Sequence, residues 1–178
     1  MLIFLILVYG IYIGSRRGLV MQAVYTIGYC ISFGIALLSY RVLAPQLDLI
    51  VPYPSTSPHS YFAFFSSSNG VSFLDTAFYR GVALLLIILV GWIVTRLIAA
   101  YLHDLTFFPL DLRTSQIGGG FLAFLCNYVA IFMVLYVLAL VPLTGLQRTL
   151  NNSLMASSMI RYSLGLPQLF YHLLIATS

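Results

Sequence analysis

The sequence predicts an all-α fold: a polytopic membrane protein with about four transmembrane helices and a C-terminal amphipathic helix at the membrane interface. Two observations lead to this prediction. First, 61% of the 178 residues are apolar and only 7% are charged, whereas a soluble domain carries roughly 25% charged residues. Second, the apolar residues form long runs, and about 20 such residues cross a bilayer as a helix. So few charged side chains cannot cover a water-exposed surface, and we expect lipid to surround the chain.

The first two runs are expected to form a helical hairpin. Residues 2–14 rise only about 20 Å as a helix, less than a hydrocarbon core of about 30 Å, so we expect a short span with local bilayer thinning. Residues 19–40 rise about 33 Å, which is a full crossing. The short segment between them predicts a very tight turn.

Residues 41–71 are predicted to form one large extramembrane loop. The segment contains four prolines, which break long helices, and it ends in a polar cluster. It begins shortly before Pro45, so we expect the second helix to end near residue 40. Ser72-Phe73-Leu74-Asp75 then has the form of a capping box, and we expect Ser72 to open the third helix.

Two further spans are predicted at residues 77–101 and 117–141. After residue 144 the chain alternates apolar and polar residues, which is typical of a helix lying on the membrane surface, and Pro167 should interrupt it. We therefore divide the chain into a transmembrane domain at 1–144 and an amphipathic C-terminal segment at 145–178.

The arginines do not decide the orientation by number. If the first turn is cytoplasmic, four arginines lie on each side of the membrane. The positive-inside rule then favours neither orientation by the number of arginines. Arg16 and Arg17 lie together in the tightest turn, which favours a cytoplasmic position for that turn. The long loop and both termini would then lie outside. The arginines stand mostly singly between apolar runs, which excludes a nucleic-acid-binding stripe.

No pattern in the sequence predicts a catalytic residue, a metal site or a cofactor site. His103, Asp104 and Asp111 form the one cluster of acids and histidine, and three ligands on a proline-containing link are too few for a rigid metal site. Cys30 and Cys126 have no metal-type spacing and are expected to be packing residues. We therefore expect a protein that is not an enzyme and that needs no cofactor.

A set of glycines and polar residues is the candidate for helix packing or for a polar pathway. Gly10 and Gly14 have GxxxG spacing, which suits a close helix contact, although glycine is also common in membrane helices. Asn127 lies about ten residues into its helix, where we expect one hydrogen bond to another helix. A polar pathway would instead gather Asn127 with Thr95, Arg96, Ser115 and Gln116. The complete candidate set is Gly10, Gly14, Arg16, Arg17, Gly18, Arg96, Asp111, Arg113, Gly118 and Asn127.

The turn Gly14-Ser15-Arg16-Arg17-Gly18-Leu19 resembles a motif of the CvpA family, the colicin V production proteins of bacteria. It is the most specific of three short motifs that do so. Leu110-Asp111-Leu112-Arg113 followed by Gly118-Gly119 is similar to an acid-arginine and glycine pattern of the family, although Leu112 separates the acid from the arginine here. Asn152-Ser153-Leu154 through Pro167 resembles the polar C-terminal segment.

The resemblance implies a multi-pass protein of the bacterial cytoplasmic (inner) membrane, linked to the production or export of a peptide bacteriocin. We expect an accessory factor for a colicin V-like toxin or for envelope maintenance, without catalysis of its own. The alternative is a small oligomeric channel or transporter. The expected partners are the lipid bilayer and other membrane proteins or further copies of the chain, with no nucleic acid and no known small-molecule substrate.

Overall fold

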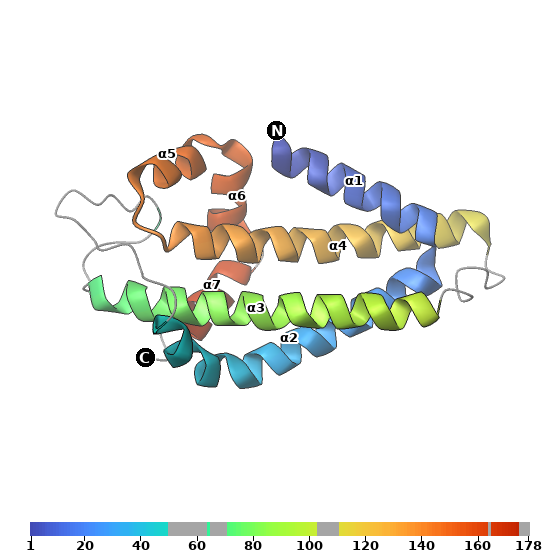
Figure 1. Cartoon of the computed structure of the whole chain (residues 1–178). Coiled ribbons are helices and arrows are strands. Elements are labelled where there is room, and N and C mark those ends of the chain that lie inside the picture. The colour runs from blue at the N-terminus through green and yellow to red at the C-terminus, as the bar shows by residue number, and fades with distance from the viewer. Residues whose placement is uncertain (50–63, 65–70, 103–110, 164, 175–178) are drawn as a thin grey trace. The chain divides into compact units, whose positions relative to one another are not determined.

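The computed structural model describes residues 1–49, 64, 71–102, 111–163 and 165–174, and the regular elements in this part of the chain are all helices (Figure 1). The all-α prediction is therefore confirmed. In chain order the helices are α1 (Leu2–Arg17), α2 (Leu19–Asp48), α3 (Val71–Tyr101), α4 (Leu112–Ala139), α5 (Thr144–Asn152), α6 (Leu154–Tyr162) and α7 (Leu166–Leu174).

Within the described ranges, three helices are long and apolar enough to cross a membrane. They are α2, the Leu74–Tyr101 part of α3, and α4. These helices contain the predicted spans at 19–40 and 77–101 and most of the span at 117–141, since α4 begins earlier than predicted and ends at Ala139. Helix α1 has 16 residues and rises about 24 Å, so residues 2–14 are helical as expected, and the short first span stays a prediction.

The predicted end of the second helix is wrong. Helix α2 continues to Asp48, so residues 41–48 are helical and not part of a loop. Pro45 lies inside this helix. Proline removes only its own N–H donor, and the helical hydrogen bonds on both sides can continue around it, as they often do in membrane helices. Of the rest of the predicted loop up to residue 70, only Leu49 and Phe64 belong to the described residues.

The predicted start of the third helix is also corrected. Helix α3 begins at Val71, so Ser72 lies within its first turn and is not the residue that precedes the helix. Because the backbone of residue 71 is already helical, the capping position falls before it. A capping-box pattern in the sequence therefore identified the right turn of the chain but the wrong residue.

The C-terminal segment is three short helices and not one amphipathic helix. Ser153 has an extended backbone between α5 and α6, and its hydroxyl accepts a hydrogen bond from the N–H of Ala156 at 3.4 Å. Gly165 has a φ of 72°, in the left-handed region that favours glycine, just before α7. Pro167 lies in the first turn of α7, where its missing N–H needs no partner, so it begins a helix and does not interrupt one.

The chain divides into two compact units. Unit 1 comprises Met1–Leu37 and Leu86–Ile131, and unit 2 comprises Leu38–Leu85 and Phe132–Ser178. Unit 1 therefore holds α1, the first part of α2, the last part of α3 and most of α4. The division of the chain at residue 144 concerned embedding in the membrane, and it stays a prediction.

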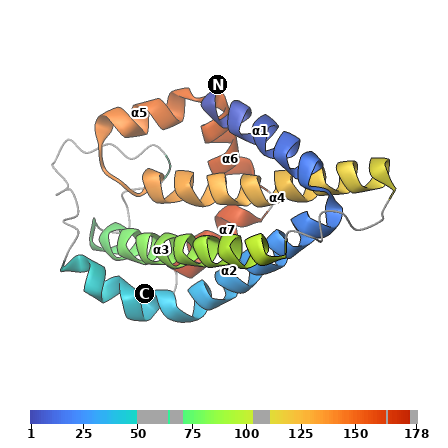
Figure 2. The same ribbon diagram turned by 45° about the vertical axis from the view of Figure 1, so that its right-hand side comes forward.

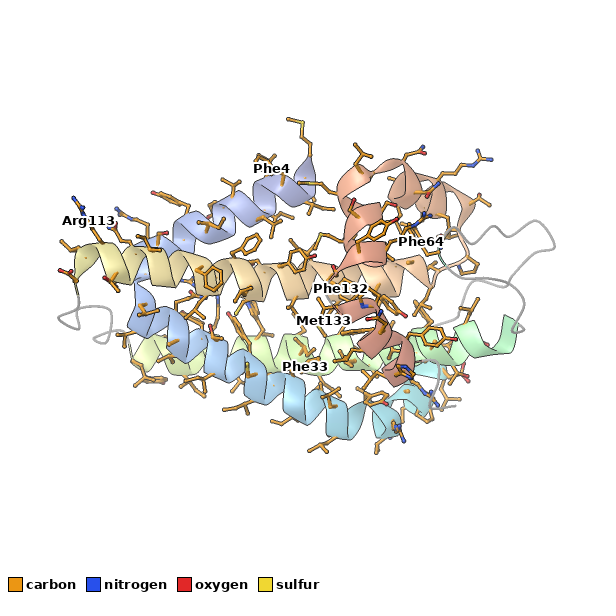
Figure 3. All side chains as sticks on the ribbon, turned by 180° about the vertical axis from the view of Figure 1, so that it is seen from behind. Phe4, Phe33, Phe64, Arg113, Phe132 and Met133 are labelled. Carbon is orange, nitrogen blue, oxygen red and sulfur yellow. The ribbon has the colours of Figure 1, made fainter. Side chains whose placement is uncertain are left out.

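The core of unit 2 is aromatic. Phe132 of α4 meets Phe170 of α7 edge-on, with 5.4 Å between ring centroids, and Tyr136 lies 5.6 Å from the same Phe170 ring (Figure 3). Phe170 is 1% exposed. The hydroxyl of Tyr40 donates to the carbonyl of Leu173 at 3.2 Å. Helix α7 is thus packed into unit 2 through its apolar face and anchored through its last turn.

A buried glutamine ties α5 to the end of α4 within unit 2. Gln147 is fully buried, and its Nε2 donates to the carbonyl oxygens of Ala139 at 2.8 Å and Val141 at 2.9 Å. The last carbonyls of a helix have no partner inside the helix. The Gln147 amide therefore supplies the donors that the end of α4 lacks.

Candidate functional site

One close helix contact in unit 1 brings the backbones of α1 and α4 together. A Cβ atom built on Gly14 would lie less than 3.0 Å from the carbonyl oxygen of Gly119 and from the side chain of Ala123. A Cβ atom on Gly119 would in turn lie less than 3.0 Å from the carbonyl oxygen of Gly14. Both glycines are buried, and the two helices run side by side here in both views (Figure 2). Only glycine permits this approach.

Gly10 lies one turn earlier in α1 and faces the side chain of Asn127. A Cβ atom on Gly10 would lie less than 3.0 Å from Nδ2 and Cγ of that asparagine. The same Nδ2 donates to the carbonyl oxygen of Ala123 at 2.8 Å, within α4. Asn127 therefore packs against α1 with an intrahelical hydrogen bond, and not with the inter-helix bond that we expected.

The turn between α1 and α2 is held by the start of α4. Gly18 has a φ of 79°, which requires glycine, and its N–H donates to the carbonyl of Gly14 at 3.1 Å. The N–H of Leu19, which has no partner inside α2, donates to Oγ of Ser115 at 3.1 Å. A Cβ atom added to Gly118 would lie less than 3.0 Å from the side chain of Leu19. The turn and the first residues of α4 thus form one contact.

The charged candidates all belong to unit 1. Arg16 is exposed, and the guanidinium of Arg17 lies 4.5 Å from the centroid of the Tyr25 ring. Arg96 lies 4.7 Å from the centroid of the Trp92 ring. Asp111 and Arg113 are exposed where α4 begins (Figure 3).

The sequence matches known proteins over most of its length. The profile of the family described as colicin V production protein matches residues 1–163. The chain belongs to this family. It is also 28% identical, over 162 residues, to a protein of Bacillus subtilis (strain 168) named uncharacterized transmembrane protein YshB, covering 91% of this chain and 89% of the relative. No solved structure matches.

This family member is thus a membrane protein, and its matched residues end just after α6. Helix α7 lies beyond the match. The first two motifs on which the resemblance was based lie in the match, and the third begins in it and runs past its end to Pro167. The first motif is the turn at which α1, α2 and α4 meet. The first motif of the resemblance therefore coincides here with a close helix contact of unit 1.

A second close contact joins α2 and α3 in unit 1, and of its residues only Thr95 was a candidate from the sequence. A Cβ atom on Gly28 would lie against Thr95, and one on Gly91 would lie against Ser32. The Thr95 hydroxyl donates to the carbonyl of Gly91 at 2.7 Å, and the Ser32 hydroxyl donates to the carbonyl of Gly28 at 2.7 Å. Both hydroxyls are therefore satisfied within their own helices. The equal spacing of Gly28 to Ser32 and Gly91 to Thr95 could have revealed this pair.

Gln22 is a polar residue that sequence reasoning missed. It is 3% exposed, and its Oε1 has no hydrogen-bond partner in the structure. One turn later on α2, the Thr26 hydroxyl lies 3.5 Å from Sγ of Cys126 on α4. A buried acceptor without a donor is unfavourable by about 1–3 kcal/mol. The signal in the sequence was an amide near the start of an otherwise apolar run.

The polar residues proposed for a pathway do not share one contact. Thr95 lies between α2 and α3, whereas Asn127 lies between α1 and α4, and Gln116 is exposed. His103 and Asp104 lie outside the described residues. Within the described ranges, no group of three or more His, Cys, Asp or Glu residues could hold a metal ion.

Proposed function

We propose that this protein is an accessory factor of the bacterial cytoplasmic membrane that supports the production or export of a colicin V-like peptide toxin, or maintenance of the envelope, without catalysis of its own. The observation that supports this proposal most is the use of polar residues in unit 1. Ser32, Thr95, Ser115 and Asn127 all bond to backbone groups at helix contacts. Polar side chains whose hydrogen bonds are satisfied by backbone groups where helices pack together suit a scaffold better than a conduction path.

Helix α1 offers the surface through which such a scaffold would bind a partner. Its buried residues are Gly10 and Gly14, and its large apolar side chains point outward. Leu5, Tyr9 and Tyr12 are 59%, 64% and 60% exposed, and their spacing places them on one face of the helix. A face of this kind binds either lipid or the apolar face of another membrane helix.

Site-specific photocrosslinking in a toxin-producing strain tests this proposal. A photoreactive residue at Tyr9 is expected to crosslink to a second membrane protein, or to a further copy of the chain, whereas the same residue at Leu97 serves as the control. Leu97 belongs to α3 of the same unit and is 61% exposed. Crosslinking to lipid alone at both positions would count against the accessory role.

A small oligomeric channel or transporter is the alternative, and the unpaired Oε1 of buried Gln22 is the observation that favours it. A buried acceptor could belong to a path that a solute or water occupies. The purified protein, reconstituted alone into liposomes, separates the two functions. An accessory factor is expected to leave entrapped ions and peptides inside. Release that Gln22→Leu abolishes would establish the channel in place of the accessory factor.

Asn127→Leu is expected to leave toxin release unchanged and to lower the stability in detergent by no more than about 1 kcal/mol, since polar contacts between membrane helices average about 0.6 kcal/mol. The physical reason is that the Asn127 amide packs on Gly10 and bonds within its own helix. Growth inhibition of a sensitive strain measures release, and thermal unfolding measures stability. Gln116→Leu, at an exposed position of the same helix, is the control. A stably inserted Asn127→Leu protein that releases no toxin would favour the transport function.

The turn between α1 and α2 is expected to lie on the cytoplasmic side, because it contains two arginines and cytoplasmic loops of membrane proteins are enriched in arginine and lysine. Gln116 is exposed next to Ser115, which bonds to this turn. In a Cys30→Ala, Cys126→Ala background, Gln116→Cys should escape an impermeant maleimide in intact cells and react with it after permeabilisation. Reaction in intact cells would place the turn outside.

A further inference from the structure

Arg96 is a charged side chain on the outer surface of a membrane-spanning helix. It belongs to the Leu74–Tyr101 span of α3 and is exposed on unit 1. Its neighbour Thr95 lies against Gly28 of α2, which is ten residues after Gly18 of the α1–α2 turn. This level is therefore about 15 Å from the turn along α2. With the arginine-bearing turn at the membrane surface, Arg96 lies well inside a hydrocarbon core of about 30 Å.

The guanidinium of Arg96 is directed away from the nearer end of α3. It lies 4.7 Å from the centroid of the Trp92 ring, and Trp92 is one turn closer to the start of the helix. Side chains on a helix tilt toward its N-terminus, so this direction is the ordinary one. The last turn of α3 also lies beside α2, because Ala99 packs with Met21 and Tyr25. The charge therefore does not extend toward the headgroups, as a long side chain at the end of a span can do.

No acidic side chain among the described residues neutralises Arg96. The described aspartates lie near helix ends: Asp48 is the last residue of α2, Asp75 lies in the second turn of α3, and Asp111 precedes α4. The partner of the guanidinium in this part of the chain is the face of the Trp92 ring. An aromatic face holds a cation in position and leaves the N–H groups at the edge of the guanidinium available to an acceptor.

Arg80, the other arginine of α3, shows how this chain satisfies a guanidinium within a span. Its Nη1 donates to the carbonyl of Leu174, the last residue of α7, at 3.1 Å. The carbonyls at the end of a helix carry partial negative charge and have no partner inside the helix. A charged side chain without an acceptor is strongly unfavourable in hydrocarbon. Arg96 therefore needs a comparable acceptor from outside the described part of the chain.

The surface around Arg96 has the form of a helix-packing face. Four exposed residues at spacings of three, four and four lie on one side of α3 and form what we call the Arg96 face: Leu89, Trp92, Arg96 and Ala100. Acyl chains could cover its apolar side chains, but they offer no acceptor to the arginine. Lipid phosphates lie at the headgroups, far from this depth. Another membrane helix can supply both an apolar surface and an acceptor.

We propose that the Arg96 face binds a transmembrane helix of a second membrane protein, and that this helix carries an aspartate or glutamate at the depth of Arg96. A carboxylate accepts paired, charge-assisted hydrogen bonds from a guanidinium, and here the Trp92 ring already holds the guanidinium in place. A further copy of the chain fits less well, because its described aspartates lie near helix ends. The inference concerns α3 and not the α1 face, so it does not depend on the crosslink expected at Tyr9.

Photocrosslinking of the full chain in cells tests the proposal, with mass spectrometry of the crosslinked peptides as the readout. A photoreactive residue at Leu89 is expected to crosslink to a transmembrane segment of another protein that has an acid within about two turns, since Leu89 is about 10.5 Å from Arg96 along α3. Arg96→Gln should lower the yield about tenfold or more, as for loss of one partner of a desolvated charge pair. Val94, exposed and about 160° around α3 from Arg96, is the control and should crosslink to lipid.

Charge reversal separates recognition of the charge from packing. Arg96→Glu should abolish the crosslink at Leu89, and an arginine in place of the partner's acid in the same cells should restore it. Arg113→Gln removes an exposed charge outside the Arg96 face and should leave the yield unchanged. Thermal unfolding in detergent shows that each variant is folded. A misfolded Arg96→Gln is replaced by Arg96→Lys, which keeps the charge without the paired geometry and should lower the yield in part.

Four outcomes would overturn the proposal. Crosslinks to lipid alone at Leu89, or no crosslink at all, would show that no protein covers the Arg96 face. A crosslink to another copy of the chain would assign the face to self-association. A partner segment without an acid, or a yield that Arg96→Gln leaves unchanged, would show that the charge is not recognised. A reversed pair that does not restore the crosslink would show that Arg96 does not pair with that acid.

Discussion

Gly14→Ala is expected to destabilise the protein by about 1–3 kcal/mol, the range for overpacking a tight contact. The added methyl group would meet the backbone carbonyl of Gly119 and the side chain of Ala123 at less than 3.0 Å. A backbone carbonyl cannot rotate away as the end of a flexible side chain can. The α1–α4 contact must therefore open, and the turn that Ser115 holds is expected to loosen with it.

Gly34→Ala is the matched control for this substitution. Gly34 lies in α2 of the same unit, and an added Cβ would meet nothing within 4 Å. Alanine is favoured over glycine inside a helix by roughly 0.5–1 kcal/mol, so this variant should be as stable as the parent or slightly more stable. Thermal unfolding in detergent measures the stability of both variants. In a chain of this size the unfolding midpoint shifts by about 2–4 °C for each kcal/mol. Equal midpoints for the two variants would refute the close contact at Gly14.

Gln147→Met is expected to destabilise unit 2 by about 3 kcal/mol. The substitution keeps the length of the side chain but removes the donor to the carbonyls of Ala139 and Val141, and each buried carbonyl without a donor is unfavourable by about 1–3 kcal/mol. Because the amide joins α5 to the end of α4, the first effect should be release of α5.

Limited trypsin digestion detects this release directly. Arg148 follows Gln147 in α5 and is exposed, so cleavage there should accelerate in Gln147→Met well before the whole protein unfolds. Gln116→Met, at an exposed position of α4, is the control and should leave both cleavage and thermal unfolding unchanged. If Gln147→Met resists trypsin as the parent does, the buried amide does not hold α5 in place.

The differences between predicted and observed elements have local causes. Pro45 was expected to end α2, but it lies inside a helix that runs to Asp48. Ser72 was expected to precede α3, but the helix has already begun at Val71. Pro167 was expected to interrupt a helix, and it stands in the first turn of one. Proline and capping residues are compatible with both the inside and the edge of a helix, and neighbouring packing decides between them.

In the candidate site, too, the sequence named the right residues but did not determine their contacts. The sequence contained Gly10, Gly14 and Asn127 as candidates, but it left open whether the glycines serve a contact, and it assigned the asparagine a bond to another helix. The structure places Asn127 on Gly10, with its amide bonded to Ala123. Gln22 went unnoticed because an isolated amide in an apolar run does not reveal whether it is buried with or without a partner.

The sequence by itself determined that this chain is an all-α membrane protein with its long helices near residues 19–40, 77–101 and 117–141. Each membrane helix satisfies its backbone hydrogen bonds within its own segment, so an apolar run of sufficient length is enough to predict it. Only the tertiary structure decided that Gly14 meets Gly119 and that the Leu19 N–H bonds to Ser115. Those pairings depend on the rotation and depth of each helix, and these are fixed by side-chain packing between segments far apart in the chain.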